Sequence, residues 1–421
     1  MNDKNTLKKN GYIKFKGDVV MGIKQKPKAE RMKNLKSLMT QINKKEGTHT
    51  IGFASDPEVK EKITVDFLPV KSLALRNSIQ GIPRGKMSLI VGNPDSGKTS
   101  FLLETIAYNQ QLDPDFIGGW LETEGSMSDE LLDMFNIDRE RFIYYEIDPE
   151  NGAAERALDY VKALCEAQVS MLVINSLKSL TPKKEMTDSM EDQNVALSAR
   201  LNAKFMRVII PTIAKSGTAL AIVQHKTTDI GSYGGGTTIT GGRAIIYNSV
   251  LTLDFNKITI KSGDAYYDRK DDFMRIRVRC LKNHVTTKQP YTVTDYTIKY
   301  GSGTDLEGEY LQAAFDFGIL NKEGGGYIRE YPEGVEHDKK NVRVLDDGSK
   351  CEWRGMNNFS AYLVEHPEYF EYLKYKIESL DLSNTVQSLS EEEIAALEEI
   401  NANEEEYLEQ LDNVLAPNEG E

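Results

Sequence analysis

A glycine-rich segment that ends in a lysine and a threonine is the strongest chemical signal in the chain. Residues 92–99 fit the pattern G-x-x-x-x-G-K-[ST], between a short apolar run and a segment with helical periodicity. Such glycines let backbone N–H groups turn toward phosphate oxygens, and the start of the helix adds its positive dipole end. We expect Lys98 to reach the β- and γ-phosphates and the Thr99 hydroxyl to ligate Mg²⁺. The pattern therefore predicts binding of ATP with Mg²⁺ by Gly92, Asn93, Pro94, Asp95, Ser96, Gly97, Lys98, Thr99 and Ser100.

Two acidic residues follow the next strand-like run along the chain. Residues 116–121 read as a buried strand, and Glu122 and Glu124 come at its end. Parallel strands deliver such residues to the carboxyl edge of a sheet, where a nucleotide binds. A carboxylate there can orient and deprotonate an attacking water, which makes Glu124 the candidate catalytic base. The alternative is a solvated loop acid.

An amide stands where a metal-supporting carboxylate is usual. Residues 170–176 occupy the Walker B position, whose last strand residue is normally an aspartate, and here it is Asn175. An amide can hydrogen-bond a metal-bound water, but it supplies no negative charge. Either Mg²⁺ binding is weaker, or Glu122, Glu124 or both compensate, and the sequence leaves these alternatives open.

The strand-like run 219–223 ends in Gln224, which is placed to sense a γ-phosphate. The loop that follows, residues 225–240, is rich in glycine and threonine and contains Lys226 and Tyr233. Polar, flexible loops with an occasional aromatic suit a nucleic-acid backbone. The alternative is an ordinary surface loop.

The elements that must position these residues alternate between strands and helices. This alternation predicts an α/β fold with a mostly parallel sheet that is covered by helices on both faces. Residues 28–45 have the periodicity of an amphipathic helix, and a small C-terminal α+β domain is expected after residue 303. The expected strands are 87–91, 116–121, 142–145, 171–174 and 219–223, with antiparallel additions at 251–255, 275–281 and 291–299. The expected helices include 101–108, 153–167, 195–214, 309–320 and 359–380, with a hairpin at 323–330 and a short helix in the tail.

Charge is distributed unevenly along the 421 residues, whose formal net charge is −13. The first 45 residues hold thirteen lysines and arginines against three acids, whereas thirteen acids and no basic residue lie from Asp381 onward. A basic head and an acidic tail are typical of proteins that handle nucleic acid, although two solvated termini would look the same. No apolar run approaches the ~20 residues of a membrane span. With no signal peptide and three widely spaced cysteines, the expectation is a cytoplasmic protein without membrane contact.

Taken together, these segments resemble the RecA family of strand-exchange recombinases, including its phage-encoded members, from about residue 32 to 376. The most specific segments are 81–85, 176–182, 197–200, 240–242 and 282–283. The resemblance implies that Glu124 is the catalytic glutamate, assisted by Lys98, and that Gln224 couples the γ-phosphate to DNA-loop order. It places the first DNA-binding loop at 186–194 and the second at 226–240. The implied DNA-binding residues are Met186, Asn194, Lys226, Tyr233, Gly234, Gly235, Gly236, Thr240, Gly241, Gly242 and Arg243.

The resemblance also implies stacking on the adenine and contacts between subunits. Tyr300 falls where an aromatic ring stacks on the adenine, and Lys282 matches a lysine that reaches the neighbour's ATP. His284 stands where a second interface lysine is expected, and Leu131 where a second adenine-stacking tyrosine is usual. The helix at 28–45 resembles the element that docks on the adjacent protomer. The acidic tail resembles a segment that competes with DNA for basic surface.

The implied function is a DNA-dependent ATPase that forms helical filaments on single-stranded DNA and promotes homologous pairing and strand exchange with double-stranded DNA. A loader or single-strand-binding protein could be a further partner, and a phage-encoded chain would act in the host cytoplasm. The expected organisation is an N-terminal extension and docking helix (1–60), a RecA-like core (61–303), a small domain (304–380) and an acidic tail (381–421). The alternatives are a hexameric RecA-like helicase and, because of Asn175, an ATP-binding filament scaffold that barely hydrolyses.

Overall fold

The computed structural model describes residues 26–47, 51–147, 154–184, 195–228, 237–239, 243–261, 270–286, 291–332, 334–345, 348–380 and 387–388. The chain forms two compact units, Met1–Thr64 and Val65–Glu421. Among the described residues, no helix combines the length and the apolar character that crossing a membrane requires.

The first unit contains α1 (Lys28–Glu46) and α2 (Pro57–Ile63). The predicted helix at 28–45 is confirmed, and it ends at Gly47, whose φ of 70° is the left-handed conformation that glycine adopts most easily. No residue of α1 is buried, and Leu35 and Leu38 of its apolar stripe are 46% and 50% exposed. The amphipathic pattern therefore forms a helix whose apolar side is left open.

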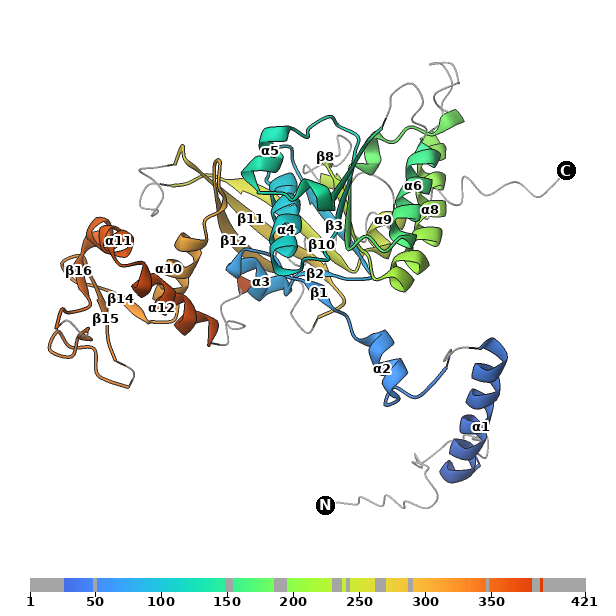
Figure 1. The fold of residues 1–421 in the computed structure, drawn as a ribbon, viewed down its shortest axis with the longest axis horizontal. Helices are drawn as coiled ribbons and strands as arrows, with labels where there is room; N and C mark the ends of the chain where they lie inside the picture. Colours follow the sequence, from blue (N-terminus) through green and yellow to red (C-terminus); the bar gives the residue numbers. More distant parts are fainter. Residues whose placement is uncertain are drawn as a thin grey trace, which may run out of the picture. The chain divides into compact units, whose positions relative to one another are not determined.

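The second unit is built on one large sheet (Figure 1). Its strand order is β13-β12-β11-β10-β3-β7-β6-β4-β5, and β17 pairs with β12. The strands from β10 to β5 are parallel, whereas β11, β12 and β13 are antiparallel additions, so the predicted α/β class and the predicted mixed sheet are both confirmed. The bounds are β3 Met87–Gly92, β4 Gly118–Glu122, β5 Phe142–Glu146, β6 Met171–Asn175, β7 Ala219–Gln224, β10 Leu251–Ile258, β11 Phe273–Asn283, β12 Thr292–Lys299, β13 Gly303–Thr304 and β17 Gln387–Ser388.

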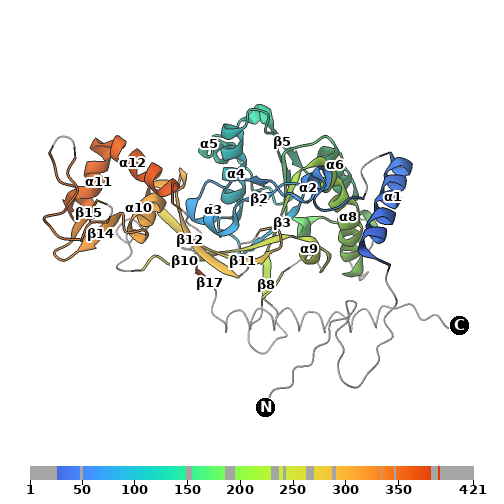
Figure 2. The ribbon, with the colours of Figure 1, turned by 90° about the horizontal axis from the view of Figure 1, so that it is seen from below.

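Helices cover both faces of this sheet, because the parallel strands carry apolar side chains on both sides. On one face, Ile90, Trp120 and Val173 pack with Phe101 and Ile106 of α4 (Lys98–Leu112). On the other face, Leu89, Leu121 and Leu172 pack with side chains of α6 (Ala154–Glu166), α8 (Val195–Ser216) and α9 (Arg243–Asn248). Figure 2 shows α4 and α9 on opposite sides of β3. We call these two faces the α4 face and the α8 face.

Smaller elements complete the core. α3 (Leu73–Ile79) and α5 (Asp129–Met134) contribute to the α4 side, and β1 (Phe67–Leu68) pairs with β2 (Ile82–Pro83). The hairpin of β8 (Lys226–Thr228) and β9 (Thr237–Ile239) follows β7 directly.

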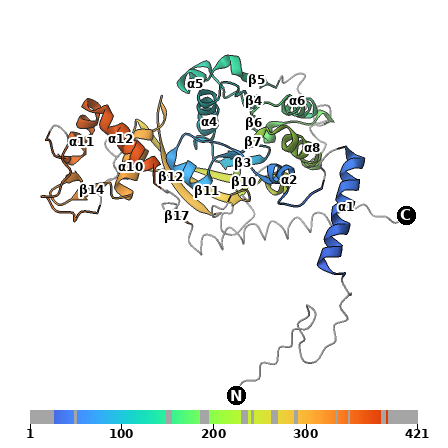
Figure 3. The ribbon, with the colours of Figure 1, turned by 60° about the horizontal axis from the view of Figure 1, so that its bottom comes forward.

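The C-terminal segment is drawn in orange and red in Figure 3. Its elements enclose a third hydrophobic cluster. It is formed by α10 (Leu306–Asp316), β14 (Leu320–Glu323), β15 (Tyr327–Glu330), β16 (Glu352–Arg354), α11 (Gly355–Glu365) and α12 (Pro367–Glu378). The predicted hairpin is confirmed, but a single helix over 359–380 is wrong. Proline lacks the N–H that a continuous helix needs, so α11 ends at Glu365 and Pro367 starts α12. The helix expected at 309–320 begins earlier and stops at Asp316, because Leu320 starts a strand.

Candidate nucleotide-binding site

The glycine-rich loop joins β3 to α4 at the carboxyl edge of the sheet. At two of its glycines there is no room for a side chain, and the backbone conformation also favours glycine. A Cβ on Gly92 would lie 2.4 Å from the Phe255 carbonyl oxygen, and one on Gly97 would lie 2.3 Å from Ile276 Cδ1. Their φ angles of 156° and 88° are positive as well. The loop is therefore held tightly between β10, β11 and the start of α4.

Lys98 is folded back over this loop. Its Nζ atom donates hydrogen bonds to the carbonyl oxygens of Gly92, at 3.1 Å, and Asn93, at 2.7 Å. Burial lowers the pKa of Lys98 to about 8, although the nearby Glu124 and Asp95 carboxylates oppose this effect. The ammonium group is thus partly desolvated, and a phosphate anion would stabilise its charged form.

The loop also has the polar groups that a triphosphate needs. Within the part of the chain that the structure describes, the buried Ser96 hydroxyl has no hydrogen-bond partner. A buried orphan hydroxyl is costly unless a ligand satisfies it. Thr99 is half-buried on the first turn of α4, whereas Asn93, Pro94 and Asp95 are exposed at the tip of the loop. These residues fit the predicted phosphate ligands, with Thr99 available to a magnesium ion.

Glu122 is a buried carboxylate that protein donors already occupy. It is 0% exposed and accepts hydrogen bonds from Trp120 Nε1 at 3.0 Å and from the Glu124 backbone N–H at 2.7 Å. The Thr123 backbone N–H donates to it at 3.1 Å and Asn175 Nδ2 at 3.1 Å. Glu122 therefore organises the end of β4.

The contact with Glu122 explains why position 175 carries an amide and no carboxylate. Asn175 Nδ2 donates to Glu122 Oε2 and, at 3.3 Å, to Ser126 Oγ. An aspartate at the same place would put two buried carboxylates in contact, which is strongly unfavourable. Because the amide nitrogen is used in this way, Oδ1 is the atom of Asn175 that can accept a hydrogen bond from a metal-bound water.

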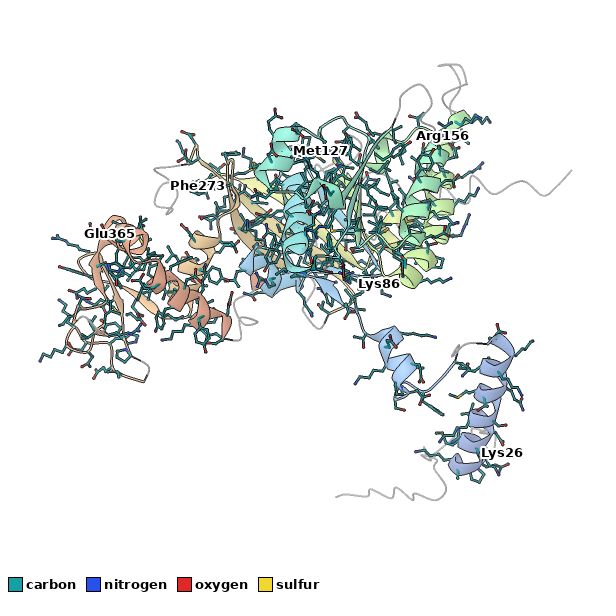
Figure 4. The ribbon with its side chains drawn as sticks, in the orientation of Figure 1. Lys26, Lys86, Met127, Arg156, Phe273 and Glu365 are labelled. Carbon is teal, nitrogen blue, oxygen red and sulfur yellow. The ribbon has the colours of Figure 1, made fainter. Side chains whose placement is uncertain are left out.

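Glu124 lies just outside this buried cluster. Its Oε1 atom accepts a hydrogen bond from Ser176 Oγ at 2.8 Å and lies 2.9 Å from His225 Nε2. The side chain is 26% exposed, and its charge is close enough to Lys98 to raise the pKa of that lysine. The candidate base and the phosphate-loop lysine thus share one site. The Glu124 segment leads to Met127, which is labelled in Figure 4.

His225 was not singled out from the sequence, which pointed to Gln224 as the γ-phosphate sensor; that role of Gln224 stays a prediction. Along β7, Ala221 and Val223 belong to the α4 face, and Leu220 and Ile222 to the α8 face. This alternation directs Gln224, which is 0% exposed, to the α8 face. His225 follows on the α4 side and reaches Glu124. The strict alternation of β7 was the signal that could have found it.

Lys226, a predicted DNA ligand, is used within the chain in this conformation. Its Nζ atom forms an ion pair with the Asp254 carboxylate and donates to Asn256 Oδ1 at 3.3 Å. The Lys226 side chain is 13% exposed and that of Asp254 only 5%. Lys226 is also close enough to Lys98 to lower the pKa of Lys98. Its DNA contact stays a prediction.

Of the predicted subunit-interface residues, Lys282 lies on β11 and His284 just beyond it, and the predicted adenine-stacking Tyr300 lies just beyond β12. Lys282 Nζ donates to the carbonyl oxygens of Ile246, at 3.1 Å, and Tyr247, at 3.2 Å, near the C-terminal end of α9. Burial lowers the pKa of Lys282. His284 is exposed, and Tyr300 is 50% exposed with its hydroxyl 3.5 Å from Lys257 Nζ. Their roles toward a neighbour or an adenine stay predictions.

Most of the predicted DNA-loop residues, and the expected helix of the acidic tail, lie outside the described residues. These residues are Met186, Asn194, Tyr233, Gly234, Gly235, Gly236, Thr240, Gly241 and Gly242. Arg243 is the first residue of α9.

A row of three arginines on β11 was not singled out from the sequence. Arg275, Arg277 and Arg279 alternate with Ile276 and Val278, which are buried in the α4-face core. The arginines therefore share the opposite face of the strand. Arg277 donates to the Asp295 carboxylate through Nε at 2.8 Å, and Arg275 lies 3.7 Å from the same group.

A phosphate loop joins the central parallel strand β3 to its helix, and the candidate catalytic groups stand at the carboxyl ends of β4, β6 and β7. This arrangement defines the class as a P-loop nucleoside triphosphatase fold. The model of the RecA N-terminal domain matches residues 33–305, so the chain belongs to the RecA family. Protein RecA of Nautilia profundicola is 28% identical over 374 residues, covering 87% of this chain and 97% of the relative. Protein RecA of Clostridium novyi is 31% identical over 306 residues, covering 71% and 82%. Protein RecA of Cutibacterium acnes is 30% identical over 326 residues, covering 76% and 89%. This membership places the chain among the ATP-binding and DNA-binding proteins of recombination and repair.

Proposed function

We propose that the chain is a DNA-dependent ATPase that assembles into filaments on single-stranded DNA and promotes strand exchange with a homologous duplex. The observation that carries this proposal is the meeting of Lys98, Glu124 and His225 at the carboxyl edge of the sheet. His225 directly precedes the predicted DNA loop. One site thus joins a phosphate ligand, a candidate base and the start of a DNA-binding element.

In the proposed reaction, the loop 92–99 binds the triphosphate and Lys98 exchanges its two carbonyl partners for phosphate oxygens. Thr99, with Asn175 acting through a water, would hold Mg²⁺, which neutralises charge on the phosphates when bound. Glu124 accepts the proton of the attacking water. The water oxygen bonds to the γ-phosphorus as the bond to the β–γ bridging oxygen breaks, and ADP and phosphate are released.

Coupling to DNA would run through His225. A γ-phosphate that reached His225 would compete with Glu124 for the imidazole, because both are anions. Movement of His225 toward phosphate would pull on Lys226 and on the β8–β9 hairpin. Nucleotide would in this way shift the loop between two populated states.

In the proposed filament, the nucleotide lies between protomers, with Lys282 reaching the neighbour's phosphates and α1 docking on the adjacent protomer. The exposed Leu35 and Leu38 support such a docking role for α1. The Arg275–Arg279 row supplies a basic strand surface suited to DNA phosphates.

One observation favours a second candidate, a filament scaffold with slow hydrolysis. Asn175 brings no charge of its own to the magnesium site, and Glu122 beside it is occupied by protein donors. Such a scaffold would bind ATP and DNA but turn over poorly.

The deciding experiment measures phosphate release with and without single-stranded DNA, alongside electron microscopy of the same samples. The proposal expects DNA-stimulated turnover, open helical filaments, and loss of both in Lys98→Ala. Filaments without turnover would favour the scaffold. Six-membered rings with duplex unwinding would favour a helicase, and normal strand exchange by Lys98→Ala would refute the mechanism.

A further inference from the structure

Ser176 is a buried hydroxyl residue to which the proposed mechanism gives no role. It follows β6 directly and is 0% exposed. Its Oγ atom donates to Glu124 Oε1 at 2.8 Å. A buried hydroxyl can be satisfied by a backbone carbonyl, but here its partner is the one side chain to which we assign the base role.

The backbone around Ser176 is fixed to the strand that carries Glu124. The Ser176 backbone N–H donates to Thr123 Oγ1 at 2.8 Å, and the Thr123 backbone N–H donates to the Asn175 carbonyl oxygen at 2.8 Å. Thr123 Oγ1 also lies 3.0 Å from the carbonyl oxygens of Asn175 and Ser176. The ends of β4 and β6 are therefore tied together beside the carboxylate, so the Ser176 hydroxyl has a defined position.

Both donors to Glu124 use the same oxygen. Ser176 Oγ and His225 Nε2 each contact Oε1, and no donor in the described part of the chain contacts Oε2. The carboxylate is thus oriented with one oxygen occupied and the other available. An available oxygen of fixed direction is what a general base needs, because it must lie within hydrogen-bond reach of the water.

The two donors differ in how firmly they are placed. Ser176 is fully buried at the sheet edge, whereas the His225 side chain is 23% exposed and precedes the β8–β9 hairpin. If His225 moves from Glu124 to a phosphate, as the proposed coupling requires, Ser176 Oγ can keep its hydrogen bond to Glu124 Oε1. Glu124 then stays oriented during the step in which it acts.

We propose that Ser176 is a positioning residue for hydrolysis, whose hydroxyl holds Glu124 Oε1 so that Oε2 accepts the proton of the attacking water. This inference rests on the proposed role of Glu124 as the base. The Ser176 hydroxyl affects the geometry of the reacting groups. Removing it leaves the phosphate-binding contacts of loop 92–99 in place.

The test is a double-mutant cycle of Ser176→Ala and Glu124→Gln in the full chain, with single-stranded DNA and ATP. Ser176→Ala should lower kcat about 10- to 100-fold, since small misplacements of catalytic groups cost that much. KM and the Kd of a non-hydrolysable ATP analogue should stay within about twofold, because binding contacts are kept. The double variant should be no slower than Glu124→Gln alone, because both changes act on one group.

Ser88→Ala is the matched control. Ser88 is a fully buried serine of β3 in the same sheet, and within the described residues its hydroxyl has no hydrogen-bond partner. Ser88→Ala should keep the kcat of the parent chain.

Ser176→Cys is the second variant, because it nearly retains the side-chain size but has a weaker hydrogen-bond donor. Its kcat should also fall, so the inference can still be tested if Ser176→Ala fails to bind nucleotide.

Unchanged kcat in both Ser176 variants would overturn the inference. So would losses that multiply in the double variant, since these would show that Ser176 acts independently of Glu124. Normal turnover in Glu124→Gln would instead refute the base assignment itself, and the positioning role would fall with it.

Discussion

Lys226 and Asp254 form an ion pair at the carboxyl edge of the sheet, between the first residue of the β8–β9 hairpin and the middle of β10. Both side chains are largely buried, and Lys226 is near enough to Lys98 to lower its pKa. The first basic residue of the predicted DNA loop is thus held beside the nucleotide site. In the proposed function, a DNA phosphate that contacted Lys226 would have to compete with Asp254 for it.

Asp254→Asn should therefore strengthen DNA binding in the absence of nucleotide. Releasing Lys226 to one more phosphate should steepen the dependence of log K on log salt by about 0.7 for single-stranded DNA. Fluorescence anisotropy over a salt series measures both quantities. Adding Lys226→Gln should cancel the gain, and identical salt slopes in Asp254→Asn and the parent chain would contradict the prediction.

Asn175→Asp should destabilise the fold, although it restores the residue usual at this position. The new carboxylate would face Glu122, and both positions are buried, at 2% and 0% exposure. An uncompensated buried charge costs about 3 kcal/mol in the free energy of unfolding. Urea unfolding measures this loss. Glu122→Gln combined with Asn175→Asp should recover most of it, because an amide again faces a carboxylate, and no recovery would argue against the explanation of Asn175.

Nucleotide binding should be accompanied by proton uptake in alkaline solution. The pKa of Lys98 is about 8 in the nucleotide-free chain, and a bound phosphate raises it, so the lysine gains a proton between the two values. Affinity for ATP should accordingly fall as pH rises through this window. Calorimetry in buffers of different ionisation enthalpy, at about pH 8.5, measures the uptake. Lys98→Arg stays charged and should abolish the Lys98 contribution; equal uptake in both chains would assign the proton elsewhere.

His225, and not Gln224, should carry the link between DNA and hydrolysis. His225→Ala should reduce the stimulation of kcat by single-stranded DNA about fivefold or more, the usual scale of a coupling between two sites. Gln224→Leu, which stays on the α8 face, should keep the stimulation provided that it folds. Comparing kcat with and without DNA separates the two residues. Retained stimulation in His225→Ala, together with its loss in Gln224→Leu, would restore Gln224 as the coupling residue.

The sequence predicted the phosphate loop and most of the sheet because those signals are local. Loop 92–99 is contiguous, and strands such as 87–91 and 219–223 are short, nearly continuous apolar runs. Contacts between residues that are far apart in the chain could not be predicted from such local signals. Glu122 and Asn175 are 53 positions apart, and their hydrogen bond depends on the neighbouring places of β4 and β6 in the sheet. The end of α11 is also a local signal, because Pro367 stands inside the segment that was expected to form one helix.

Lys282 has a consequence for how chains begin to assemble. In a single chain its ammonium group is already satisfied by the carbonyl oxygens of Ile246 and Tyr247. If it serves a neighbour's phosphates in the filament, each new junction must first break these two hydrogen bonds. This cost is the same at every junction, from the first pair of chains to the longest filament. It lowers the net free energy of each subunit addition, so a higher concentration of chain is needed before filaments form.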